Sequence, residues 1–170
     1  MIINKTWHMP NKNTFLIRPF AHLIGKYIKD GVWIDPFCRN SIFKNKCVTN
    51  DLNPNIIADY NLDALEFLQL FDDNSVDGVL LDPPYSPRQV KDSYDSIGKK
   101  VTAKDTKISF WTNIKNEIAR VVKSNGTVIT FGWNTNGIGK KNNFKSIEIL
   151  IVSHGSMHND TLAVVEIKND

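Results

Sequence analysis

Acidic side chains recur where short apolar runs end, and the last of them is followed by two prolines and a tyrosine. Residues 76–81 form an apolar run that leads into Asp82, Pro83, Pro84 and Tyr85. Proline has a fixed φ and no backbone N–H, so two in succession end a strand, and each pushes the preceding residue out of the helical region. We therefore expect Asp82 and Tyr85 to be held rigidly at the carboxyl end of a strand, where ligands bind in open α/β sheets.

Three more acids occupy comparable places in the sequence. Asp35 and Asp51 each follow an apolar run, and Asp63 lies at the start of an expected helix. Because the carboxyl ends of parallel strands share one edge of a sheet, these carboxylates are predicted to meet along one crevice. Such a row could bind a metal, or it could accept hydrogen bonds from the hydroxyls and amines of a ligand. Taken singly, each aspartate could also simply cap a loop.

The spacing of apolar residues predicts the elements that position these acids. Expected strands cover residues 32–35, 47–50, 56–59, 76–81 and 127–131, and an antiparallel hairpin covers residues 144–152 and 161–168. Expected helices begin at Arg18–Pro19 and end near Asp30–Gly31, begin at Asn61 as the cap, and begin at Asp105 or Thr106 and end at residues 124–126. The intervening segments are predicted to be irregular: residues 1–15, residues 36–46 with one helical turn, residues 86–105 and residues 132–143.

The order of these elements predicts an α/β fold. Alternating strands and helices imply a mostly parallel sheet with helices on its faces, and the terminal hairpin makes that sheet mixed. The 170 residues contain no repeat and no linker, so we expect one domain over residues 1–170, with no separate module for target recognition.

Composition narrows the classes of function. No apolar run approaches the roughly 20 residues that a membrane helix needs, and the first residues lack the apolar core of a signal peptide. The two cysteines, Cys38 and Cys47, suggest a reducing cytoplasm and no disulfide or zinc framework. The net charge of +3 is weak evidence for an anionic partner.

The motifs together resemble those of the S-adenosylmethionine-dependent amino-methyltransferases. More narrowly, they are similar to the small DNA adenine-N6 methyltransferases of phages and mobile elements. The resemblance covers roughly residues 14–168 and rests on Ile34-Asp35-Pro36-Phe37-Cys38, Asn50-Asp51-Leu52-Asn53, Asp63-Ala64-Leu65, residues 82–98 with the Asp82-Pro83-Pro84-Tyr85 tetrad, and residues 131–140. It implies a Rossmann-like methyltransferase fold, S-adenosyl-L-methionine as cofactor and a bacterial or phage-infected cytoplasm.

The resemblance also implies a role for each matching position. Asp35 would accept from the cofactor's ammonium group, Asp51 would hold the ribose hydroxyls, and Asp63 would lie near the adenine amine. The full set of implied cofactor contacts is Phe15, Ile17, Asp35, Pro36, Phe37, Asp51, Leu52, Asp63 and Ala64. The implied catalytic set is Asp82, Pro83, Pro84 and Tyr85.

One loop departs from the family's pattern. The family has Asp-Pro-Phe, any residue, Gly-Ser-Gly, whereas this chain continues after Phe37 with Cys38-Arg39-Asn40-Ser41. In the family, the two glycines let the backbone pass close to the cofactor, and this chain lacks both. Arg39 and Asn40 could crowd it, or Asn40 could take a left-handed conformation, which asparagine tolerates.

The chemistry of the tetrad follows from the target. The exocyclic amine of adenine is a poor nucleophile, and the Asp82 carboxylate and the Pro83 carbonyl can each accept one of its N–H groups. Tyr85 would stack on a base flipped out of the duplex, with Trp133 or Phe37 as a second ring. Trp133 could equally be a core residue. We expect no metal, because a metal would compete with the cationic sulfonium for the same acids.

Two predicted loops are basic and are expected to bind phosphates of double-stranded DNA. The first carries Arg88, Lys99 and Lys100, and the second carries Lys140 and Lys141. A solvated lysine-rich surface is the alternative. His154 and His158 are expected in the hairpin turn. Since no recognition module remains, a homodimer could supply further contacts to the duplex.

Two other functions stay open. The same tetrad could methylate cytosine N4 or structured RNA, although tyrosine in the last place favours adenine. The chain could instead be a non-catalytic subunit of a methyltransferase assembly. The missing loop glycines favour that reading, and the intact tetrad disfavours it.

Overall fold

The computed structural model describes residues 1–95, 97–98, 108–155 and 157–170. Its strands are β1 Ile2–Trp7, β2 Trp33–Asp35, β3 Val48–Thr49, β4 Val76–Leu81, β5 Val122–Gly132, β6 Phe144–Ser153 and β7 Thr161–Lys168. Its helices are α1 Arg18–Tyr27, α2 Ala64–Leu68, α3 Pro87–Asp95 and α4 Ile108–Val121, and three short 3-10 helices are η1 Thr14–Leu16, η2 Lys44–Lys46 and η3 Lys140–Asn142.

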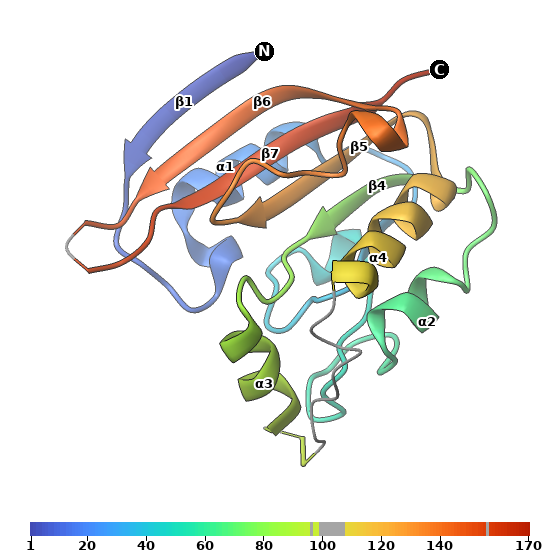
Figure 1. The fold of residues 1–170 in the computed structure, drawn as a ribbon, viewed down its shortest axis with the longest axis horizontal. Coiled ribbons are helices and arrows are strands. Elements are labelled where there is room, and N and C mark those ends of the chain that lie inside the picture. The colour runs from blue at the N-terminus through green and yellow to red at the C-terminus, as the bar shows by residue number, and fades with distance from the viewer. Residues whose placement is uncertain (96, 99–107, 156) are drawn as a thin grey trace.

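All seven strands join one sheet in the order β1-β6-β7-β5-β4-β2-β3 (Figure 1). The pairs β2–β3, β2–β4, β4–β5 and β1–β6 are parallel. Strand β7 lies between β5 and β6 and is antiparallel to both. The predicted α/β class, the mixed and mostly parallel sheet, and the terminal hairpin are therefore confirmed.

Each face of the sheet has its own core because successive strand residues point to opposite faces. On one face α1 packs Phe20, Leu23 and Ile24 onto residues that include Leu80. On the other face α2 and α4 pack onto residues that include Val79 and Leu81. Figure 1 shows α1 behind the sheet and α2 and α4 in front of it. The helix predicted from the one-sided pattern after Arg18 is confirmed.

The first prediction to be wrong concerns residues 1–15, which were expected to be irregular. Residues Ile2–Trp7 form β1, an edge strand whose six residues are all exposed. Without a buried face, the segment shows no alternation of apolar and polar residues, which is the signal of a strand. Asn4 Nδ2 donates to Glu148 on β6, which helps to hold the strand in place.

The expected third strand, residues 56–59, is also absent from the structure. Asn50 and Tyr60 form only an isolated parallel bridge. The Asp59 carboxylate accepts from both the backbone N–H and the hydroxyl of Thr49, at 2.8 Å each. Together with two backbone hydrogen bonds, from Tyr60 N to Thr49 O and from Asp51 N to Tyr60 O, these side-chain bonds hold the segment beside β3.

The predictions for the helices need three corrections. The cap of α2 is Asp63, whose Oδ1 accepts from Leu65 N, and not Asn61. Strand β5 begins at Val122, directly after α4, so residues 124–126 belong to the strand and do not end the helix. Helix α3 occupies part of the stretch 86–105 that was predicted to be a loop. The predicted caps Asp105 and Thr106 lie outside the described residues.

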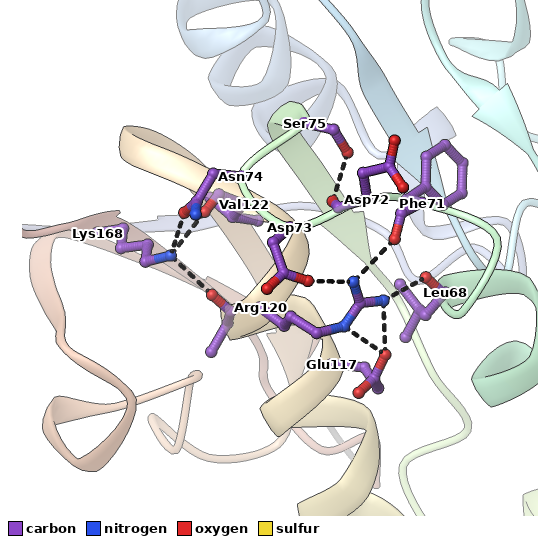
Figure 2. A network of polar contacts seen from close by, with 11 residues as sticks. Leu68, Phe71, Asp72, Asp73, Asn74, Ser75, Glu117, Arg120, Val122 and Lys168 are labelled. Atoms are coloured by element: carbon purple, nitrogen blue, oxygen red, sulfur yellow. Dashed lines mark hydrogen bonds and ion pairs between the residues drawn. The ribbon is translucent and has the colours of Figure 1, made fainter.

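Near the amino ends of β4 and β5, two charged side chains, Arg120 of α4 and Lys168 of β7, connect neighbouring elements by hydrogen bonds. The Arg120 guanidinium on α4 donates to Glu117, to Asp73 and to the carbonyl oxygens of Phe71 and Leu68 (Figure 2). Beside it, Lys168 Nζ donates to Asn74 Oδ1 and to the carbonyls of Ala119 and Val122. This network fastens the connection before β4 to the end of α4.

Within the described ranges, no helix is both long enough and apolar enough to cross a membrane.

Candidate active site

A cavity of about 850 Å³ opens at the carboxyl ends of β2, β3, β4 and β5. The predicted site residues that line it are Ile17, Pro36, Phe37, Asp51, Leu52, Asp63, Ala64, Asp82, Pro83, Pro84, Tyr85 and Trp133. Asp51, Asp63 and Asp82 therefore lie along one crevice, as the sequence predicted, whereas Asp35 does not line it. The volume lies within the range of ordinary small-molecule sites.

The tetrad forms one wall of the cavity directly after β4. The Tyr85 hydroxyl donates a hydrogen bond to Asp82 Oδ1. Tyr85 N donates to Gln89 Oε1 at 2.6 Å, so the first turn of α3 holds the backbone after the two prolines. Asp82 and Tyr85 are both partly buried, and their positions are fixed relative to each other.

The environment of this pair shifts both pKa values upward. Burial raises the pKa of Asp82, while hydrogen bonds from Tyr85 and Thr14 and the charge of Arg39 oppose the shift. Burial, followed by the Asp82 charge, raises the pKa of Tyr85 well above its usual range. Tyr85 therefore stays protonated and acts as a donor to Asp82. Strongly shifted groups in a cavity are a property of functional sites.

Asp35 is fully buried at the end of β2, directly before Pro36 and Phe37, which line the cavity. Its Oδ1 accepts from Phe37 N at 3.2 Å. Among the described residues, Oδ2 is buried without a hydrogen-bond partner. Burial raises the pKa of this carboxyl group well above its usual range, hydrogen bonds from Phe37 N and Ser41 oppose the shift, and the Asp82 and Asp51 charges raise it further. A buried polar atom without a partner costs free energy, and a cationic ligand would remove that cost.

Asp51 lines the cavity and fixes two loops. Its Oδ2 accepts from Arg39 N at 2.9 Å, and its Oδ1 accepts from Asn53 N at 2.8 Å. Arg39, and not Asn40, takes the left-handed conformation, with φ 41°. The carboxylate therefore organises the loop in which the family's glycines are replaced.

Asn50 and Asp63 hold the next part of the wall. The Asn50 side chain is fully buried; it donates to the carbonyls of Pro36 and Leu62 and accepts from Leu62 N at 2.9 Å. It thereby joins the loop after β2 to the segment before α2. Asp63 caps α2 and lines the cavity.

The aromatic rings lie differently from the predicted sandwich. Trp133 packs edge to face against Tyr85, with centroids 5.6 Å apart and planes at 66°. The two rings touch, so no base fits between them in this arrangement. Phe37 packs near Trp111 of α4, with centroids 6.4 Å apart. Trp133 is 41% exposed and lines the cavity, so it is not a core residue.

Phe15 and Arg88 do not line the large cavity. Phe15 packs against Phe43 and Phe131, with centroids 6.1 and 5.1 Å away, and borders only a small niche beside Arg39. Arg88 is exposed on α3 and does not line the cavity. Lys99 and Lys100 lie outside the described residues.

The prediction that Lys140 and Lys141 flank the site is wrong. They lie in η3, which precedes Phe144, and Phe144 pairs with Lys168. Lys168 Nζ donates to Val122 O at the amino end of β5, so η3 lies at the edge of the sheet opposite the strand ends that line the cavity. The cause is the buried Glu166 on β7, which accepts from Ile138 N and Gly139 N and draws the loop along the sheet.

Several lining residues were not identified from the sequence. Gln89 follows the tetrad on the helix that was predicted to be a loop. Thr14 lies in η1, Trp111 in α4, and His154 and Asn159 on the connection between β6 and β7. Both ring nitrogens of His154 have partners, His8 O at 2.8 Å and Thr161 Oγ1 at 3.0 Å. Of these residues, Gln89 alone had a local sequence signal, because it follows the tetrad in the polar stretch that forms α3.

No protein-family model and no curated protein matches the sequence. Solved structures do match the fold. A SAM-dependent methyltransferase from Archaeoglobus fulgidus aligns with a TM-score of 0.63 at 10% identity, over 93% of this chain and 95% of that one. The N-methyltransferase NodS from Bradyrhizobium japonicum gives 0.62 at 10% identity, over 95% and 100%.

The third comparison is with 1,6-didemethyltoxoflavin-N1-methyltransferase from Burkholderia thailandensis. It gives a TM-score of 0.61 at 11% identity over 94% of this chain and 80% of that chain, and that structure contains S-adenosylhomocysteine. At these identities the likeness establishes architecture only. The chain has the Rossmann-like fold of the SAM-dependent methyltransferases.

Proposed function

We propose that this protein transfers a methyl group from S-adenosyl-L-methionine to the exocyclic N6 amine of adenine in DNA. The observation that carries the proposal is the position of the tetrad. Asp82, Pro83, Pro84 and Tyr85 follow β4 and line the same cavity as Asp51 and Asp63. The Asp82 carboxylate and the Pro83 carbonyl, which can accept from an amine, thus lie in the same cavity as two acids, Asp51 and Asp63, that can accept from the hydroxyls and amine of a nucleoside.

Residues that line the cavity, and the buried Asp35 beside it, fit this cofactor. Asp35 Oδ2 is buried without a described partner, and a cationic ammonium group would satisfy it. Asp51 already accepts two backbone N–H groups, and each carboxylate oxygen can still accept a second hydrogen bond, here from a ribose hydroxyl. Phe37 and Ala64 give the same wall an apolar surface. When bound, the cofactor supplies an electrophilic methyl group on a positively charged sulfur.

The chain's own contribution to the chemistry is to hold the amine. The Asp82 carboxylate and the Pro83 carbonyl each accept one N–H of the target, which localises the nitrogen lone pair. The prolines keep both acceptors rigid, so little reorganisation is needed as charge develops on the nitrogen. Asp82 must be ionised to accept, and its raised pKa means that activity falls on acidification from a higher pH than for an ordinary carboxyl group.

Two contacts must change when a base binds. The Tyr85 hydroxyl occupies Asp82 Oδ1, so the incoming amine shares or displaces it. Trp133 touches Tyr85 and must turn away before a base can stack on the tyrosine ring. Trp133 is 41% exposed, so this rotation costs little buried surface.

A second candidate is methylation of a small-molecule amine. The position of Lys140 and Lys141 at the opposite edge favours it, because it removes part of the basic surface expected beside the pocket. Two of the similar structures are N-methyltransferases, and one of these is named for a small-molecule substrate. The tetrad, with tyrosine in its last place, favours adenine.

Transfer of a labelled methyl group from S-adenosylmethionine separates these alternatives. Unmethylated duplex DNA, single-stranded DNA, structured RNA and free adenosine are offered in parallel, and the products are hydrolysed and identified. We expect N6-methyladenine from duplex DNA and none with Asp82→Asn. N4-methylcytosine, or label in RNA or free adenosine alone, would contradict the choice of substrate. Cofactor binding without transfer to any of them would indicate a non-catalytic subunit.

A further inference from the structure

Arg39 stands where the resembling family has glycine, and its side chain borders the cavity. It is exposed, and it lines both the large cavity and the small niche beside it. Its backbone is fixed by the left-handed φ of 41° and by the bond from its N–H to Asp51. The guanidinium is near enough to the tetrad for its charge to act on Asp82 and Tyr85.

A second cation lines the same niche as Arg39. Lys12 lies on the segment before η1, is exposed, and lines the same two cavities. Within the part of the chain that the structure describes, neither Lys12 nor Arg39 forms an ion pair, unlike Lys26, Arg120 and Lys123. Two cations that form no ion pair with a described residue thus border the niche end of the cavity.

Acids lie at the same end. Asp82 lines the niche together with Lys12 and Arg39, and the charge of Asp82 acts on the buried Asp35. An α-amino-acid group carries an ammonium and a carboxylate on one carbon, and it fits a site with an acid on one side and a base on the other. A nucleic-acid phosphate carries only negative charge, which these acids would repel.

We propose that Arg39, with Lys12, binds the carboxylate of the methionine part of the cofactor, so that this end of the cavity selects a zwitterion. The proposal rests on the proposed cofactor and deepens it. It explains why an arginine can stand in place of the family's glycine, because the arginine side chain supplies a contact that the loop backbone alone does not. Arg39 is the stronger contact, since a guanidinium can donate two parallel hydrogen bonds to a carboxylate.

Calorimetric binding of two ligands tests the proposal on the full chain. The ligands are S-adenosylmethionine and its decarboxylated form, which keeps the amine and the sulfonium but lacks the carboxylate. We expect the wild type to prefer the carboxylated ligand by about 10- to 100-fold, the range for hydrogen bonds to a charged group. Arg39→Gly should reduce that preference by about tenfold or more, and Lys12→Met should reduce it less.

Arg39→Gly also controls for folding, because glycine adopts the φ of this position without strain. Its unfolding temperature should equal or exceed that of the wild type. Arg39→Lys should keep part of the preference. Lys46→Gln is the matched control, since Lys46 is an exposed cation on the same connection that does not line the cavity, and it should leave the preference unchanged.

The outcomes distinguish this inference from the proposed function. If the wild type binds both ligands equally, the carboxylate subsite is absent and the cofactor assignment stands. If Arg39→Gly keeps the preference but weakens binding to duplex DNA, Arg39 contacts phosphate and the inference is wrong. If the wild type binds neither ligand, the cofactor assignment itself fails.

Discussion

The two ends of strand β4 carry aspartates in opposite electrostatic environments. At its amino end, Asp77 accepts from Lys123 Nζ at 2.8 Å and from Val32 N at 2.8 Å, and these bonds hold its pKa below the usual range. Just beyond its carboxyl end, burial raises the pKa of Asp82. The ionised form is stabilised at one end of the strand and disfavoured at the other.

The same difference extends along both edges of the sheet. Near the amino end, Arg120 and Lys168 make hydrogen bonds to carboxylates, amides and carbonyls (Figure 2). Near the carboxyl end, Asp35 has an oxygen without a described partner, and Lys12 and Arg39 form no ion pair with any described residue. The comparison indicates that one edge stabilises the fold, while the other keeps polar groups available for ligands, as natural proteins do at functional sites.

The largest expected effect is the loss of kcat when the aspartate just beyond the carboxyl end of β4 is replaced. Asp82→Asn should lower kcat by about 10²- to 10³-fold, the range for loss of one preorganised polar contact in a transition state. It should not lower the free energy of unfolding at neutral pH, because ionised Asp82 is disfavoured in the folded protein. Steady-state methyl transfer and urea unfolding measure the two effects.

Asp77→Asn is the matched control for that change. A lowered folded pKa contributes stability above the unfolded pKa, and this contribution is lost as pH falls through the folded pKa. Asp77→Asn should therefore cost about 1 kcal/mol at neutral pH and nothing in strong acid, with kcat unchanged. Equal losses of activity in the two variants would contradict the division between the two ends.

The ring and the hydroxyl of Tyr85 are expected to act separately. Tyr85→Ala should weaken binding of the target by about 5- to 100-fold, because base stacking contributes about 1–3 kcal/mol. Tyr85→Phe keeps the ring but removes a donor to Asp82, so it should move the acidic limb of the pH–rate profile to higher pH. An unchanged limb in Tyr85→Phe would show that Asp82 is not the group that titrates.

Arg120 tests the opposite edge. Arg120→Met should lower the free energy of unfolding by about 1–3 kcal/mol, since it leaves two carboxylates and two carbonyls without this donor. KM and kcat should stay within about twofold below the unfolding temperature, because the network lies away from the cavity. Arg18→Met, at an exposed position without a described ion pair, is the control. A large change in kcat for Arg120→Met would mean that the two edges are coupled.

Asp35 should link cofactor binding to pH. Its raised folded pKa makes the ligand-free protein lose stability as pH rises through that pKa. A cationic ligand favours the ionised form, so binding should release protons and strengthen as pH rises from ordinary carboxyl values. Calorimetry in buffers of different ionisation enthalpy measures the release, and Asp35→Asn should abolish it while stabilising the ligand-free protein. Binding independent of pH in the wild type would contradict this role.

The smallest effect is expected for the lysines of η3. Lys140→Gln with Lys141→Gln should change affinity for duplex DNA by less than about twofold at fixed salt, because η3 lies at the edge opposite the cavity. Arg88→Gln on α3, close to the tetrad, should weaken binding more and reduce its salt dependence. A larger loss from the double lysine change would show that DNA also contacts the amino edge.

The sequence predicted the acids and the tetrad that line the cavity because their signals are local. A strand followed by an acid and two prolines is recognisable without tertiary information, and Asp82, Asp51 and Asp63 all line the cavity as expected. Strand β1 could not be predicted in this way, since it is an exposed edge held by pairing with β6, which lies far along the chain.

The errors at Lys140 and Lys141 have a different cause. The loop after β5 begins at the cavity, but Glu166 draws its middle toward the opposite edge. That carboxylate lies 28 residues beyond Ile138, so no local pattern indicates the path. Likewise, the left-handed residue of the first loop is Arg39 because Asp51 accepts its N–H, a contact that residue preferences alone did not reveal.

The most direct test is the product in a cell. The wild-type chain and Asp82→Asn are expressed in a host without DNA methylation, and the hydrolysed DNA is analysed by mass spectrometry. We predict N6-methyladenine with the wild type and none with Asp82→Asn at equal levels of folded protein. Equal amounts of N6-methyladenine from the two chains, or N4-methylcytosine in its place, would contradict the assignment of the carboxyl end of β4 to adenine methylation.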